Sequence, residues 1–227
     1  MRPLIWWLVL SGILIGSWLV TPMAGQAATQ ITQSQVQVKI TPNEDDSAVK
    51  PVDPDDPSKP YPGDPADPGN VDGTGSRGRL TIDYLSNLKF NSVTTASGPA
   101  TATAKNSKAM VQVSDRRSTG SGWTLQVLPS APTNGKKALA ATIDLGTIEI
   151  KPVTETVSGT PQLVNEGHLV AGRVNNVLKA GQQAGLGTWL LIMNRGSQPT
   201  TLHLNDVKIP AGDYTGTLTW SLTNAPS

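Results

Sequence analysis

The stretches that decide the fold are residues 123–127, Trp-Thr-Leu-Gln-Val, and residues 218–222, Leu-Thr-Trp-Ser-Leu. Apolar and polar side chains alternate in both, which indicates half-buried β-strands, because successive side chains of a strand point to opposite faces. Each stretch therefore places a Trp and the Leu two positions later on one face: Trp123 with Leu125, and Trp220 with Leu222. Their aliphatic neighbours on the same face favour burial in a hydrophobic core over contact with a ligand.

The rest of the chain is also typical of strands. Alternating or short apolar stretches occur at residues 36–40, 80–84, 110–113, 138–145, 148–150 and 201–205. Residues 189–193 are continuously apolar, which predicts a strand covered on both faces. Only residues 173–183 have helical spacing, and Asn134-Gly135 predicts a hairpin turn. Many short strands between Gly, Pro and Asn predict an all-β fold, either a β-sandwich or a barrel-like domain.

Composition and charge divide the chain into two parts. The 227 residues include no cysteine, which excludes disulfides, thiolate metal sites and a catalytic thiol. Residues 43–72 hold nine acidic residues against two lysines, whereas residues 73–227 hold 14 Lys or Arg against 8 Asp or Glu. The formal net charge of +1 therefore hides an asymmetry, which indicates an acidic tether joined to a basic module.

The N-terminus is typical of an export signal. Arg2 precedes an apolar run over residues 4–20, and Gly25-Gln26-Ala27 has the small-x-small pattern of a signal peptidase site. The run is short for a membrane span, although an uncleaved anchor is the alternative. We therefore predict a signal peptide over residues 1–27 and no membrane span in the mature protein. Residues 28–42 then hold a strand that we expect to join the main sheet, since an isolated strand is unstable in water.

Residues 43–78 are predicted to form an acidic, proline-rich, disordered spacer. Asp-Pro recurs four times between Asp53 and Pro68, and like charges on a polyproline helix keep such a chain extended. Calcium binding is the alternative, but no Asp-x-Asp-x-Asp-Gly loop with a downstream Glu is present, so no metal is expected. Residues 73–78 match G-x-G-x-x-G without the strand before it or the helix after it, which favours a flexible joint over a nucleotide site.

Catalytic motifs are weak, so we predict no enzyme, no catalytic residue and no cofactor. His168 and His203 are the only imidazoles, and Gly120-Ser121-Gly122 lacks the spacing of a nucleophile elbow. Asp144 and Glu149 could in principle act as paired carboxylates, but nothing in the sequence selects them.

The basic residues suggest a different partner. They occur as scattered pairs, Arg116-Arg117 and Lys136-Lys137, without the aromatic pattern of a nucleic-acid-binding domain, so no nucleic acid is expected. In an exported protein they favour contact with anionic polymers of the cell wall. An ordinary solvated surface is the alternative, because the charge excess is moderate.

Through its two Trp-x-Leu stretches the chain resembles the WxL-domain family of surface proteins of low-GC Gram-positive bacteria. The similarity covers the Asp-Pro segment, Asp115-x-Arg117 before Gly122-Trp123-Thr124-Leu125, and the ending that contains Thr219-Trp220-Ser221-Leu222. The resemblance implies a WxL-type β-domain over residues 79–227 that binds peptidoglycan non-covalently at the cell-wall surface. In that family Trp123, Leu125, Trp220 and Leu222 are the signature residues, and partner wall-binding surface proteins are implied. The alternative is a structural subunit or adhesin whose main ligand is another protein or a host molecule.

Overall fold

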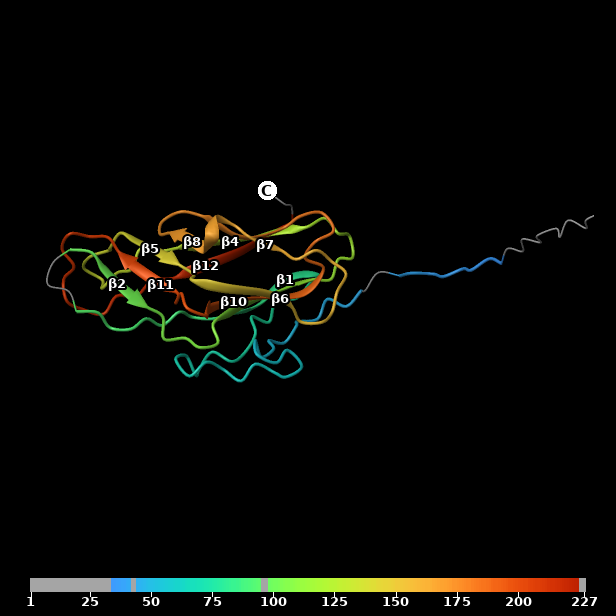
Figure 1. The fold of residues 1–227 in the computed structure, drawn as a ribbon, viewed down its shortest axis with the longest axis horizontal. Coiled ribbons are helices and arrows are strands. Elements are labelled where there is room, and N and C mark those ends of the chain that lie inside the picture. Colours follow the sequence, from blue (N-terminus) through green and yellow to red (C-terminus); the bar gives the residue numbers. More distant parts are fainter. Residues whose placement is uncertain (1–33, 42–43, 95–97, 225–227) are drawn as a thin grey trace, which may run out of the picture. The chain divides into compact units, whose positions relative to one another are not determined.

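The computed structural model describes residues 34–41, 44–94 and 98–224 (Figure 1). The chain divides into two units, residues 1–40 and residues 41–227. All regular secondary structure among the described residues belongs to the second unit.

The N-terminal predictions have different outcomes. The predicted signal peptide, residues 1–27, lies outside the described residues. Residues 34–41 have no regular secondary structure, and Val36 and Ile40 are 90% and 86% exposed. The strand expected at residues 36–40 is therefore not formed there, and its pairing with the main sheet stays a prediction.

The second unit is built from short strands, which confirms the all-β fold. The strands are β1 (Leu80–Leu85), β2 (Ala100–Thr103), β3 (Met110–Asp115), β4 (Trp123–Pro129), β5 (Ala141–Asp144), β6 (Thr147–Pro152), β7 (Gln162–Leu163), β8 (His168–Val170), β9 (Asn175–Ala180), β10 (Gly187–Arg195), β11 (Thr201–Leu204) and β12 (Leu218–Thr223), with a 3-10 turn, η1 (Asn165–Gly167), before β8. No helix within the described ranges has the length and hydropathy needed to cross a membrane.

These strands form three four-stranded antiparallel sheets with the orders β1-β3-β10-β6, β12-β4-β9-β7 and β2-β11-β5-β8. The inner faces of the first two sheets share one hydrophobic core, to which β3 contributes Val113, β4 contributes Leu125 and β10 contributes Leu191. Ile143 and Leu169 of the third sheet extend that core. The first two sheets thus pack face to face, as in a β-sandwich.

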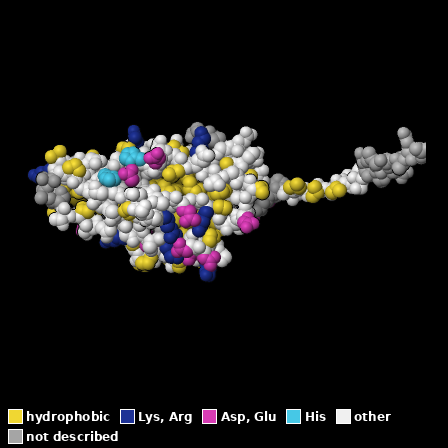
Figure 2. Space-filling model, viewed as in Figure 1, with side chains coloured by type: hydrophobic (Ala, Val, Ile, Leu, Met, Phe, Trp, Pro, Cys, Tyr) yellow, Lys and Arg dark blue, Asp and Glu magenta, His cyan; other side chains and the backbone are white. Residues whose placement is uncertain are grey.

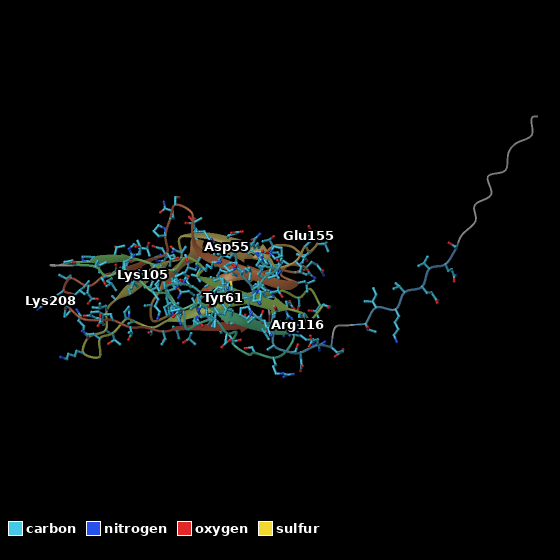
Figure 3. All side chains as sticks on the ribbon, turned by 90° about the horizontal axis from the view of Figure 1, so that it is seen from below. Asp55, Tyr61, Lys105, Arg116, Glu155 and Lys208 are labelled. Carbon is cyan, nitrogen blue, oxygen red and sulfur yellow. The ribbon has the colours of Figure 1, made fainter. Side chains whose placement is uncertain are left out.

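Strand β10 is covered on both faces, as its continuous apolar sequence predicts. Leu191 points into the main core, while Leu190 and Ile192 lie in a second cluster on the other face of the sheet. That second cluster is completed by Tyr61, which is 7% exposed and lies over the sheet (Figure 3). Its ring contacts that of Tyr84, with 4.7 Å between the ring centroids.

The acidic segment, residues 44–78, therefore differs from the disordered spacer expected from its composition. Asp64 is 3% exposed, and its carboxylate accepts hydrogen bonds from the backbone N–H groups of Ser107 and Lys108 at 2.9 and 2.6 Å. Asp53 pairs with the Lys108 ammonium at 2.9 Å. These contacts, together with the burial of Tyr61, hold the segment against the β1-β3-β10-β6 sheet. The Asp-Pro repeat supplies turns and carboxylates for this docking.

Residues 173–183, the stretch with helical spacing, contain strand β9 and no helix. The pairing of β9 with β4 shifts register so that Leu125 lies opposite Leu178 and Gln126 lies opposite Asn176. Val177 is the extra residue of a β-bulge, and both Val177 and Leu178 are buried. Two consecutive inward side chains break the alternation of a strand and imitate the spacing of a helix.

Candidate functional site

The two Trp-x-Leu stretches lie side by side in one sheet. Strand β12 pairs antiparallel with β4, so that Leu222 lies opposite Leu125 and Trp220 lies opposite Val127. The structure therefore brings together two motifs that are almost a hundred residues apart in sequence.

Trp123 is fully buried, with 0% of its surface exposed. Its indole Nε1–H donates a hydrogen bond to the Gly185 carbonyl oxygen at 3.0 Å. Two glycines with positive φ make room for this arrangement. A Cβ at Gly185 would lie 2.6 Å from Trp123 Nε1, and a Cβ at Gly122 would lie 2.2 Å from the Ala180 carbonyl oxygen. Trp123 thus serves the packing of the core.

Trp220 is half-buried, because β12 is the edge strand of its sheet. Trp220 and Leu222 pack against the same core as Trp123 and Leu125, while Ser221 between them is exposed. The inward placement of the apolar side chains predicted from sequence is confirmed in both strands, and exposure alternates along β12, whereas Thr124 of β4 is buried as well. Strand β12 therefore divides its side chains between an apolar inner face and an outer face of hydroxyls.

The outer face beside Ser221 carries polar side chains, together with Lys179 opposite Thr124 and the exposed Leu128 opposite Thr219. Gln126 lies opposite Ser221, and its Nε2 donates to the Asn176 Oδ1 at 2.7 Å. Thr219 and Thr223 are exposed on the same face of β12. Amide and hydroxyl groups on adjacent strands form a row that can donate and accept hydrogen bonds.

A buried ion pair fastens the start of β4. The side chain of Asp115 is 0% exposed, and Arg117 donates to it through Nε at 2.9 Å and Nη2 at 2.8 Å. The same guanidinium donates to the Gly122 carbonyl at 2.8 Å and to Asn224 Oδ1. Asp115 raises the pKa of Arg117. The spacing Asp115-x-Arg117 was visible in the sequence, but not its role of joining β3, β4 and the end of β12.

The other three cations proposed for anionic polymers are placed differently. Arg116 donates through Nη2 to the carbonyls of Ser47 and Gly78 at 2.6 and 2.7 Å, and its side chain is 14% exposed (Figure 3). Lys137 pairs with Asp206 at 2.9 Å. Lys136 lies exposed on the predicted Asn134-Gly135 turn, which forms. The four cations are therefore not gathered at one site.

A buried carboxyl that the sequence did not single out lies on the outer side of β1. Asp83 is 1% exposed and accepts hydrogen bonds from the Thr81 and Ser114 hydroxyls at 2.7 and 2.6 Å and from Gln112 Nε2 at 3.2 Å. Burial raises the pKa of Asp83, an effect that the hydroxyl donors oppose. Gln112 also donates to the Lys50 carbonyl, so the network ties the acidic segment to the sheet.

The histidines meet at one carboxylate. His168 Nδ1 lies 2.5 Å from Asp144 Oδ1, and His203 Nε2 lies 2.9 Å from Asp144 Oδ2. Figure 2 shows both imidazoles beside a carboxylate on the surface. Glu149 lies on β6 and pairs with Lys151 at 3.5 Å, whereas the recorded partners of Asp144 are the two imidazoles. Among the described residues, no group of three or more His, Cys, Asp or Glu is arranged to hold a metal ion.

The fold and the two Trp-x-Leu strands define an all-β domain in which a repeated tryptophan motif serves the core of one sheet. The chain belongs to the WxL family, described as a WxL domain, surface, cell wall-binding, and the match covers residues 27–226. This confirms the resemblance and makes the protein a cell-wall surface protein with a wall-binding domain. No curated protein and no solved structure gives a significant match.

Proposed function

We propose that the protein is exported and binds non-covalently to peptidoglycan or its associated anionic polymers, without catalysing a reaction. The observation that carries this proposal is the match of residues 27–226 to a wall-binding domain family. Export rests on the signal peptide expected over residues 1–27, with cleavage after Ala27. Assembly with partner wall-binding surface proteins is part of the same proposal.

The burial of the Trp-x-Leu side chains supports wall contact through the outward side chains of the same strands. Trp123 and Leu125 have 0% exposure, so they cannot touch a polymer without unfolding of the sheet. The outer face holds Ser221 and Gln126. Glycan strands are rich in hydroxyl and amide groups, and the hydroxyl and amide side chains of this face match that chemistry.

The basic residues contribute less to the proposed contact than their number suggests. Arg116, Arg117 and Lys137 hold internal partners, which leaves Lys136 as the best supported of the four candidate cations. We assign the other three to the folding of the domain.

The experiment that tests the function is retention of the purified mature protein on protein-free sacculi, with and without their anionic polymers. Retention on both preparations supports peptidoglycan as the ligand, and retention only on the sacculi that keep their anionic polymers supports those polymers. Failure on both would reject wall binding and support the structural subunit or adhesin.

Two variants of β12 test the outer face. Ser221→Asp adds a negative charge to an exposed position and should weaken retention without lowering the melting temperature. Ser221→Ala is the matched control, because it keeps the charge of the face. If Ser221→Asp is retained like the wild-type protein, the outer face of β12 is not the contact surface.

A further inference from the structure

The sheet β2-β11-β5-β8 carries a charge pattern that the wall-binding motif does not explain. Its strands have the sequences Ala-Thr-Ala-Thr, Thr-Leu-His-Leu, Ala-Thr-Ile-Asp and His-Leu-Val. Within these strands the ionisable side chains are His168, Asp144 and His203. These are also the two histidines of the whole chain. The charge of this sheet therefore depends on three residues.

The register places the three residues in one outward row. His168 pairs with Asp144 across β8 and β5, and His203 lies on β11 beside β5. Neighbouring side chains such as Ile143 and Leu169 point into the core, so the row faces outward. The side chains of His168 and His203 are 49% and 35% exposed, which leaves them open to a partner.

The surroundings of the row are hydroxyls. Thr101 Oγ1 lies 3.3 Å from His203 Nδ1, and Thr142 and Thr201 lie opposite His203 and Asp144 in the sheet. The charged residues that flank these strands in sequence are Lys105, Glu166, Arg173 and Asp206, of which Asp206 is paired with Lys137 at 2.9 Å. None of these flanking charges is recorded in contact with either imidazole within the described residues.

The arrangement is poorly suited to catalysis. The distance of 3.3 Å between Thr101 Oγ1 and His203 Nδ1 exceeds the usual reach of a nucleophile and its base. The row also lies on an exposed sheet face. A surface whose charge changes with pH is the property that this geometry offers.

Resting on the proposed wall binding, we infer that the outward face of β2-β11-β5-β8 is a second contact surface, which binds phosphodiester polymers in mild acid. Imidazoles change charge between pH 5 and 8, whereas an exposed carboxylate stays ionised across that range. With both imidazoles neutral, Asp144 makes the row negative and repels phosphate. With both protonated, the row is positive, and His168 Nε2–H, which has no partner among the described residues, can donate to a phosphate oxygen.

The test measures binding of a soluble poly(glycerol phosphate) to the mature protein at about pH 5.5 and about pH 7.5. The wild-type protein should bind roughly fivefold more tightly at the lower pH, because two charges at an exposed surface are each worth a modest interaction. The double variant His168→Gln/His203→Gln should bind equally at both pH values. Asp144→Asn should bind more tightly than the wild-type protein at both.

The variants are matched with Lys50→Gln, which removes one exposed positive charge from the acidic segment on the β1-β3-β10-β6 sheet and should keep the pH response. Melting curves of all variants establish folding, and the exposed positions make large losses of stability unexpected. A wild-type affinity that is equal at the two pH values would overturn the inference. So would a pH response that survives in the double variant, or an Asp144→Asn protein that binds no more tightly.

The proposed function is tested separately in the same series. Retention on sacculi stripped of anionic polymer, at about pH 7.5, does not depend on the protonated imidazoles. A protein that is retained there but shows no acid-dependent polymer binding keeps its wall-binding function and loses the second surface. A protein that binds the polymer in acid but is retained on neither sacculus preparation at about pH 7.5 keeps the second surface and loses the proposed function.

Discussion

Replacing Trp123 by Ala should unfold the domain more readily than replacing Trp220, although both belong to the same motif. Trp123 is fully buried and donates a hydrogen bond to the Gly185 carbonyl, whereas Trp220 is half-buried on an edge strand. Truncating a buried Trp costs about 3–5 kcal/mol, and the unpaired carbonyl adds about 1 kcal/mol. A half-buried Trp loses about half of the packing term, or ~2 kcal/mol.

These costs translate into melting temperatures. For a domain of this size, 1 kcal/mol corresponds to about 2–4 °C. Trp123→Ala should therefore melt ~8–24 °C lower than the wild-type protein, and Trp220→Ala ~4–8 °C lower. Because total stability is about 5–15 kcal/mol, the first variant can be largely unfolded at the growth temperature.

The assay is thermal unfolding, followed by sacculus retention measured well below each melting temperature. Below that temperature both variants should be retained like the wild-type protein, since we expect neither side chain to contact the polymer. Trp220→Phe, which keeps a ring in the core, should melt closer to the wild-type protein than Trp220→Ala. A Trp220→Ala protein that melts like the wild type and is not retained would instead make Trp220 a ligand contact.

Three further outcomes follow from the buried groups. Arg117→Ala leaves Asp115 buried and unpaired, and should lower the free energy of unfolding by about 3–5 kcal/mol in urea titrations, whereas Lys136→Ala should change it by less than about 0.5. Burial raises the pKa of Asp83, so its protonated carboxyl contributes fully to the stability of the folded protein below about pH 4. As the pH rises from about 4 through that raised pKa, urea titrations of the wild-type protein should show a loss of stability relative to Asp83→Asn. Tyr61→Ala should expose the outer face of the β1-β3-β10-β6 sheet. The expected results are increased binding of a hydrophobic dye and faster proteolysis of the acidic segment.

The fold class could be predicted from the sequence because alternation in β4 and β12 is strict. The continuous apolar run of β10 also predicted a strand covered on both faces. It did not identify the covering element, because Tyr61 lies in a segment whose composition is typical of disorder. Strand β9 was not recognised, since the bulge at Val177 makes its burial pattern irregular.

The site could be predicted only in part. The inward orientation of Trp123, Leu125, Trp220 and Leu222 follows from local periodicity and is confirmed. The meeting of His168 and His203 at Asp144 depends on the order and register of β8, β5 and β11, which no local pattern encodes. A contact between distant strands needs the sheet topology before it can be stated.

The charge asymmetry of the chain acquires a different meaning once the acidic segment is placed. Sequence alone suggested a tether that leaves a basic module free to attract anions. In the structure, carboxylates of the segment are paired with cations: Asp46 with Arg77 inside the segment itself, and, outside it, Asp67 with Lys89, Asp53 and Asp55 with Lys108, Asp45 with Arg116, and Asp55 with Arg195. The Lys108 ammonium lowers the pKa of Asp55, as expected for a formed pair.

Much of the positive charge is therefore neutralised within the domain itself, and the long-range field that would draw in an anionic polymer is weak. Because screening acts on the charges that remain, wall retention near neutral pH should depend only modestly on salt. The same neutralisation gives a surface pair of imidazoles more weight than it would have on a strongly basic protein, since a change of two charges is large beside a formal net charge of +1. The recognition of anionic polymer by this domain should thus respond to pH more than to the number of its lysines and arginines.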